Sequence, residues 1–147
     1  METMISCRLI EFGSKEQIES IELRRKILRF PIGLDFNAED LESENKQFHF
    51  AAFLDENLVA VLIMVKYGQG VVKMRQVAVD NHLQGNGIGK ALVKYSENWA
   101  IANQLTQIQL HARSNAVPFY KSMKYEIIGE QFLEVGLPHF KMQKTLI

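Results

Sequence analysis

The chain has 147 residues, of which 47% are hydrophobic and 23% charged, and its formal net charge is zero. This length and composition are ordinary for one soluble globular domain with its own core. No apolar run approaches the roughly 20 residues of a membrane-spanning helix, and residues 1–10 lack the pattern of a secretory signal. The single cysteine, Cys7, excludes an intrachain disulfide and argues against a four-ligand zinc site. We therefore expect a cytoplasmic protein that holds no metal and does not associate with membranes.

The charges are unevenly distributed along the chain. Residues 1–60 hold 7 Lys or Arg against 12 Asp or Glu, whereas residues 61–147 hold 10 against 5. The second part is therefore basic, which suits an anionic ligand. Because the excess is small and no run of Lys or Arg occurs, the sequence does not favour nucleic acid as a partner.

Hydrophobic periodicity and turn residues predict alternating strands and helices. The first part of the chain is predicted to form a strand at 5–12, a helix at 15–29 that Pro31 ends, a loop or short helix at 31–46, a hairpin at 47–54 and 58–66, and a strand at 71–80. A helix follows at 88–103, with Leu92, Tyr95, Trp99 and Ala102 on its buried face. The rest is predicted as a strand at 106–113, a short helix at 114–124 capped by Ser114 or Asn115, and strands at 125–134 and 139–147. The order β-α-β-β-β-α-β-α-β-β predicts one α+β domain over residues 1–147, with a central mixed sheet.

Residues 84–90, which read Gln-Gly-Asn-Gly-Ile-Gly-Lys, are the most informative segment of the chain. They lie between a predicted strand and a predicted helix. A glycine-rich turn of this kind directs backbone N–H groups toward one point, with the positive end of the helix dipole behind them. The arrangement is suited to bind a phosphate or pyrophosphate.

Two common phosphate-binding motifs do not fit this segment. A Walker A loop requires glycine where the chain has Gln84 and a hydroxyl residue where it has Ala91. A dinucleotide fingerprint requires the spacing G-x-G-x-x-G after the first strand of a βαβ unit, whereas the spacing here is G-x-G-x-G after a predicted hairpin and a third strand. A turn that binds no ligand stays open, although three glycines in five residues are entropically costly.

The segment instead resembles the Q/R-x-x-G-x-G/A motif of the GNAT superfamily of acyl-CoA-dependent N-acyltransferases, with Gln84, Gly87 and Gly89 at the motif positions. Residues 115–125 are similar to that family's N-x-x-A-x-x-F-Y-x-x-x-G-F segment, with Pro118 where Ala is usual and Lys-Tyr for the final Gly-Phe. Residues 132–142 and 23–29 resemble the closing signature and first helix of one GNAT subgroup. These blocks cover most of the chain in the family's order.

The resemblance implies a mostly antiparallel sheet flanked by helices in three α/β layers, acetyl-CoA as cosubstrate without a metal, an amine acceptor and a homodimer. It also implies three groups of cofactor-binding residues. The pyrophosphate is expected to be bound by Gln84, Gly85, Asn86, Gly87, Ile88, Gly89 and Lys90, and the pantetheine arm and thioester by Val77, Ala78 and Val79. The third group, later in the chain, is Asn115, Phe119 and Tyr120. Each of these residues also has an ordinary structural explanation, such as a strand in the core for Val77 and Val79 or a helix cap for Asn115.

Three residues are candidates for the chemistry that the resemblance implies. Tyr120 is predicted to give its proton to the leaving thiolate. His139 is the first candidate and Glu134 the second for the base that deprotonates the amine, while His111 is more simply explained as a structural residue of a strand. Cys7 is expected to be a small buried hydrophobe rather than a nucleophile. The alternative function is a non-catalytic module that binds or senses acyl-CoA on the same fold.

Overall fold

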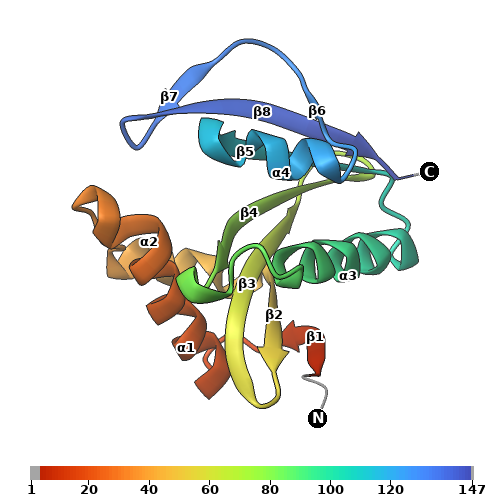
Figure 1. Cartoon of the computed structure of the whole chain (residues 1–147). Helices are drawn as coiled ribbons and strands as arrows, with labels where there is room; N and C mark the ends of the chain where they lie inside the picture. Colours follow the sequence, from red (N-terminus) through yellow and green to blue (C-terminus); the bar gives the residue numbers. More distant parts are fainter. Residues whose placement is uncertain (1–3, 147) are drawn as a thin grey trace. The chain divides into compact units, whose positions relative to one another are not determined.

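A computed structural model describes residues 4–146 of the chain (Figure 1). The described residues form two compact units. The first contains the chain up to Met64 together with Gln76–Ser96, and the second contains Val65–Arg75 and the chain from Glu97. Within the described part, no helix has both the length and the apolar character needed to cross a membrane.

The first unit is built on the N-terminal strands. β1 pairs antiparallel with β2, β2 pairs antiparallel with β3, and β4 follows as the next neighbour in the sheet. Its elements are β1 (Ile5–Ile10), α1 (Lys15–Arg24), α2 (Ala38–Glu42), β2 (Phe48–Leu54), most of β3 (Asn57–Lys66), the end of β4 (Val71–Val79) and the start of α3 (Ile88–Ala102). Its core joins α1 to the sheet through Ile10, Leu23, Ala51, Phe53, Val61 and Ala78.

The second unit is built around β5 and β8. β4 pairs parallel with β5, β5 pairs antiparallel with β8, and the short strands β6 and β7 both pair antiparallel with β8. Its further elements are β5 (Gln107–Arg113), α4 (Val117–Ser122), β6 (Glu126–Ile127), β7 (Phe132–Glu134) and β8 (Leu137–Thr145). The described residues thus form eight strands in a mixed, mostly antiparallel sheet, which confirms the predicted fold class.

The first predicted helix differs from the structure at its end. It is α-helical only to Arg24, continues as a π-helical turn over Arg25–Arg29 and a 3-10 turn over Phe30–Ile32, and ends at Gly33 with φ 73°. Pro31 therefore does not end the helical segment. It lies at the start of the 3-10 turn, where a proline is tolerated because a backbone N–H would have no partner there.

The cap predicted for the second short helix is also wrong. A 3-10 turn over Ser114–Ala116 precedes α4, and no side chain makes a capping hydrogen bond to either segment. The proline at the start of α4 supplies the fixed φ instead. The strand predicted at 125–134 is divided into β6 and β7, because the chain between them leaves the ladder at Gly129, with φ 86°. The last strand begins at Leu137, and Ile147 lies outside the described residues.

The buried face of α3 is only partly the predicted one. Tyr95 is 37% exposed and Ala102 is exposed, and the buried positions are Ile88, Gly89, Leu92, Val93, Ser96, Glu97 and Ala100. Glu97 can be buried because its carboxylate accepts hydrogen bonds from Tyr125, at 2.9 Å, and from Lys144, at 3.0 Å. Polar pairing of this kind is not visible in a hydrophobic pattern.

Candidate functional site

The glycine segment lies between β4 and α3, as the sequence predicts. Gly85 and Gly87 have φ of 87° and 80°, in the left-handed region that favours glycine. The first hydrogen bond into α3 runs from the Ala91 amide to the Gly87 carbonyl, at 3.0 Å. The amides of the first three helical residues precede that bond, so the helix supplies no acceptor for them. A side chain at Gly85 or Gly87 would meet nothing within 4 Å, which leaves space for a ligand at the loop.

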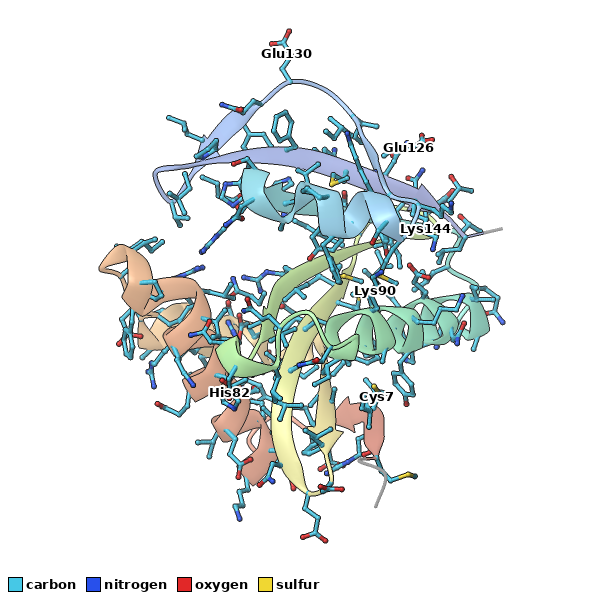
Figure 2. All side chains as sticks on the ribbon, viewed as in Figure 1. Cys7, His82, Lys90, Glu126, Glu130 and Lys144 are labelled. Carbon is cyan, nitrogen blue, oxygen red and sulfur yellow. The ribbon has the colours of Figure 1, made fainter. Side chains whose placement is uncertain are left out.

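Side chains of the same segment hold its shape. Gln84 Nε2 donates to the Val79 carbonyl at 3.0 Å and so ties the loop to the end of β4. Asn86 Nδ2 donates to the Leu83 carbonyl at 3.3 Å. Lys90 is exposed on the first turn of α3 (Figure 2). The loop therefore offers backbone N–H groups, with one lysine beside them, to an anion.

The end of β4, which carries Val77, Ala78 and Val79, departs from regular strand geometry at Gln76, where φ is 56°. The hydrogen-bonded register of β4 with β5 covers Val71–Met74 and Gln107–Leu110, and it stops before this residue. Ala78 is buried in the core, whereas Val77 and Val79 are half-buried. The backbone of this segment is therefore not engaged in the β4–β5 ladder.

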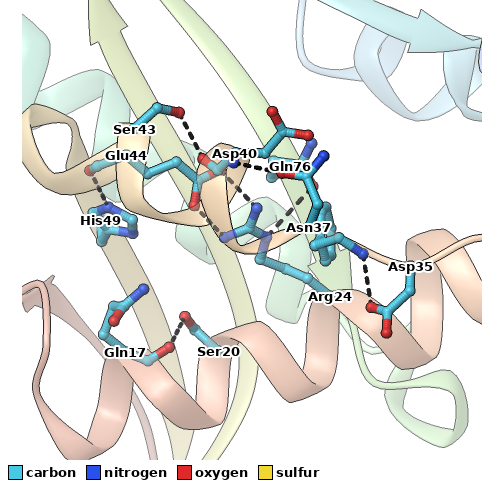
Figure 3. Close-up of polar contacts among 11 residues, drawn as sticks. Gln17, Ser20, Arg24, Asp35, Asn37, Asp40, Ser43, Glu44, His49 and Gln76 are labelled. Atoms are coloured by element: carbon cyan, nitrogen blue, oxygen red, sulfur yellow. Dashed lines mark hydrogen bonds and ion pairs between the residues drawn. The ribbon is translucent and has the colours of Figure 1, made fainter.

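A buried ion pair contacts the side chain of Gln76 (Figure 3). Arg24 on α1 donates two hydrogen bonds to the Glu44 carboxylate, each of 2.8 Å, and its Nε donates to Gln76 Oε1 at 3.4 Å. Arg24 is 1% and Glu44 2% exposed. The Phe36 ring packs against the guanidinium, 4.5 Å from the ring centroid to Cζ, and a His49 ring nitrogen lies 2.9 Å from the Glu44 carbonyl. The sequence did not predict this cluster, because a charged pair on an α-helix and a 3-10 turn gives no periodic signal.

Tyr120 lies on α4 and is buried, with its ring edge-on to Phe119 and Tyr125 at 5.0 and 5.7 Å between centroids. Burial raises the pKa of its phenol well above the usual range. Full transfer of its proton to a thiolate of pKa about 8.5 is then uphill. The phenol is better suited to donate a hydrogen bond to sulfur than to ionise.

Asn115 lies in the 3-10 turn before α4. The spacing of the family's N-x-x-A-x-x-F-Y segment, counted back from Phe119 and Tyr120, falls on Arg113 and Ala116 rather than on Asn115 and Pro118. Arg113, at the end of β5, thus occupies the place of the family's asparagine.

Three polar residues from three strands meet in the second unit, and we name them the His–Glu–His cluster. His111 Nδ1 on β5 lies 3.0 Å from Glu134 Oε1 on β7, and His139 Nε2 on β8 lies 3.5 Å from Glu134 Oε2. Phe132 packs against both imidazole rings, with centroids 4.9 and 6.0 Å apart. Partial burial raises the pKa of Glu134, but the His111 hydrogen bond and the nearby cations outweigh this effect and the net pKa is lowered. The carboxylate is therefore ionised near neutral pH.

The two histidines of the cluster are not equivalent. His139 Nδ1 lies 2.9 Å from the Leu137 carbonyl, so we assign its proton to that nitrogen, and its side chain is 4% exposed. His111 is 28% exposed, and its Nδ1 proton is assigned to the hydrogen bond with Glu134. That assignment leaves His111 Nε2 with a free lone pair on the more accessible ring.

Known proteins similar to this chain belong to the family that its sequence motifs indicate. Residues 34–146 match the sequence model of the acetyltransferase (GNAT) domain. The chain belongs to the GNAT family. An uncharacterised N-acetyltransferase of Bacillus subtilis, YjcF, is 32% identical over 105 residues, which are 70% of this chain and 74% of that protein.

Solved structures share the GNAT fold with this chain. A protein from Lactobacillus plantarum assigned as an N-acetyltransferase superposes with a TM-score of 0.87 at 19% identity, over 97% of this chain and 99% of the other. An aminoglycoside 6'-N-acetyltransferase solved with coenzyme A superposes with a TM-score of 0.80 at 18% identity, over 97% of each chain. At these identities the likeness shows the fold alone.

Within this GNAT chain, the structure brings some of the predicted site residues together. The residues from Val77 to Lys90 form one continuous segment of the first unit, and Glu134 and His139 meet in the second unit, which also holds Asn115, Phe119 and Tyr120. His111 joins that pair, although the sequence favoured a structural explanation for it.

Cys7 is half-buried in β1 and burial raises the pKa of its thiol, which disfavours the nucleophilic thiolate. Among residues 4–146, no group of three or more His, Cys, Asp or Glu is arranged to hold a metal.

Proposed function

We propose that the chain transfers an acetyl group from acetyl-CoA directly to a primary amine, within a ternary complex. The observation that carries this proposal is the loop at the start of α3, whose positive-φ glycines and unpaired helical amides suit a pyrophosphate. Membership of the GNAT family and the coenzyme A complex of a neighbour with the same fold support acyl-CoA as the donor. The loop also contains Gln84, which donates to the Val79 carbonyl, and the exposed Lys90.

The pantetheine arm and the thioester are assigned to the end of β4. From Gln76 on, β4 lies beyond the β4–β5 ladder, so the backbone groups on the edge of β4 away from β3 suit an extended ligand that pairs as a strand would. One amide in the segment from Val77 to Val79 polarises the thioester carbonyl and stabilises the oxyanion of the tetrahedral intermediate.

His111 is the general base in this proposal, with Glu134 as its partner. The acceptor amine is protonated at neutral pH, with a pKa of about 10.4, and becomes nucleophilic only after losing a proton. The lone pair on His111 Nε2 takes a proton, and the Glu134 carboxylate holds the ring and stabilises the resulting imidazolium. His139 is more deeply buried and lies on the other side of Glu134, with Nε2 3.5 Å from Oε2.

The reaction balances without another reactant. The neutral amine nitrogen attacks the thioester carbon, the C–N bond forms, and the C–S bond breaks as the tetrahedral intermediate collapses. The nitrogen loses one proton to the base before it attacks and a second proton after the C–N bond has formed, and this second proton goes to the sulfur, which leaves as the thiol of coenzyme A. Tyr120 donates a hydrogen bond that stabilises the developing thiolate.

The test measures thiol release from acetyl-CoA with a panel of amines. We expect turnover for the wild-type chain, and a loss of about tenfold or more in kcat/KM for His111→Ala, with disappearance of the acidic limb of its pH profile. Glu134→Gln moves that limb to lower pH, because the amide no longer favours the charged imidazolium. His139→Ala serves as the matched control and keeps the limb. Acetyl-CoA binding without turnover would support the non-catalytic sensing module, and an unchanged limb in His111→Ala would dismiss this base.

A further inference from the structure

The sheet face of the second unit that carries the His–Glu–His cluster is polar across three strands. Lys73 on β4 is in register with Gln109 on β5, and on β8 Lys141 lies opposite His111. Residues opposite each other share a face, as do alternate residues of one strand. This face, which we name the cationic face, comprises Lys73, Arg75, Gln109, His111, Arg113, His139, Lys141 and Gln143. The opposite face holds the buried Ile108, Leu110, Ala112 and Met142.

The cationic face has more positive than negative charge. Its lysines and arginines are Lys73, Arg75, Arg113 and Lys141, and each is half-buried. The strand register places two carboxylates on this face: Glu134, which lies beside both histidines, and Glu126, which is exposed on β6 opposite Gln143.

These cations are close enough to act on one another. Burial lowers the pKa of Lys73, Glu134 partly offsets that effect, and the charges of Arg75 and Lys141 add to it. Burial also lowers the pKa of Arg113. Like charges held together in a partly desolvated place repel, and an anion among them relieves the repulsion.

We propose that the cationic face binds a carboxylate or phosphate group of the acceptor, so that the substrate is a small amine that also carries negative charge. This inference rests on the proposed function. The acceptor is assigned here, rather than a phosphate of acetyl-CoA, because the same face carries the base. An anionic group placed on Lys73, Lys141 or Arg113 brings its neighbouring amine to the face of the sheet that also carries His111. The positive field also raises the encounter rate with such a substrate.

The first experiment compares acceptors in matched pairs, using thiol release from acetyl-CoA by the full chain. Phenylalanine is compared with 2-phenylethylamine, lysine with cadaverine, and phosphoethanolamine with ethanolamine. We expect the anionic member of a pair to have a kcat/KM about tenfold or more above its partner, with a preference that falls as salt is added. The first two pairs report on a carboxylate and the third on a phosphate.

The second experiment neutralises cations on the face. Lys73→Gln and Lys141→Gln are expected to raise the KM for anionic amines several-fold and to leave the KM for neutral amines and for acetyl-CoA unchanged. Lys15→Gln, at an exposed position of α1, is the matched control and should change none of these values. Circular dichroism checks that each variant is folded.

The outcomes separate this inference from the proposed function. Equal kcat/KM values within every pair would overturn the anionic acceptor and leave the acetyltransferase intact. A raised KM for acetyl-CoA in Lys73→Gln and Lys141→Gln would also overturn it, because the face would then serve the cosubstrate's phosphates. If no amine in the panel releases thiol, the proposed function itself fails.

Discussion

Replacement of Arg24 by Met breaks an ion pair that is almost fully removed from water. Arg24 and Glu44 are 1% and 2% exposed, and the change removes two charged hydrogen bonds of 2.8 Å. Hydrogen bonds to charged groups contribute about 1.5–3 kcal/mol each. Loss of one partner of a buried pair costs about 3–5 kcal/mol, because the other charge stays in the interior. Both estimates put the loss in free energy of unfolding at about 4 kcal/mol, which is a large part of the roughly 5–15 kcal/mol that stabilises a domain.

Urea unfolding of the full chain measures this loss. With a slope of about 2 kcal/mol per molar urea, the midpoint of Arg24→Met should fall by about 2 M. The double variant Arg24→Met/Glu44→Leu should recover most of the loss, because apolar side chains of similar volume can replace a buried pair at little cost. Arg25→Met, at the next residue of the chain, is the matched control. Its ion pairs with Glu22 and Asp35 are exposed, so its midpoint should stay near that of the wild type.

Two results would refute this reasoning. If Arg24→Met unfolds within about 1 kcal/mol of the wild type, the pair is worth no more than an exposed one. If the destabilisation of the double variant equals the sum for Arg24→Met and Glu44→Leu measured separately, the two side chains act independently. The lost stability then comes from packing rather than from charge pairing.

Two further predictions concern the donor side. Tyr120→Phe should lower kcat by about tenfold or more while the KM for acetyl-CoA hardly changes, and near wild-type turnover would remove Tyr120 from the mechanism. Gly87→Ala should raise the KM for acetyl-CoA, because alanine at φ 80° is strained by about 1 kcal/mol and the amides of the loop shift. Gly33→Ala, at φ 73° and outside the loop, should lower stability to a similar degree without affecting that KM. Equal effects of the two alanines on KM would contradict the assignment of the loop.

The elements that the sequence predicted well are those fixed by local chemistry. Gly85 and Gly87 take the positive φ that only glycine adopts easily, and the periodic apolar residues after them begin a helix at Ile88, as predicted. Boundaries set by tertiary contacts were predicted poorly. Pro31 looked like a terminator, although the chain continues around it in a 3-10 turn. The strand predicted at 125–134 was likewise not divided at Gly129, where the chain leaves the ladder of β8.

The same distinction applies to the candidate site. Glu134 and His139 lie on either side of a tight turn at Val135 and Gly136, both with positive φ, and they are the end and the start of the strands predicted at 125–134 and 139–147. His111 joins them only through the register of β5 with β8, which pairs residues more than twenty positions apart. A signal was nevertheless present, because residues 107–113 alternate polar and apolar. That alternation put Gln109, His111 and Arg113 on one face before any partner strand was known.

The Arg24–Glu44 pair also bears on function, because its third contact is Gln76. A residue other than glycine at φ 56° within a strand costs about 1–2 kcal/mol, so the surroundings must stabilise that conformation. Apolar replacement of the pair can restore stability but cannot hold the Gln76 amide. The double variant should therefore fold like the wild type and yet have a reduced kcat, since the proposed thioester site is the strand segment that begins at Gln76. Full activity in a fully stable double variant would reduce Arg24 to a structural role.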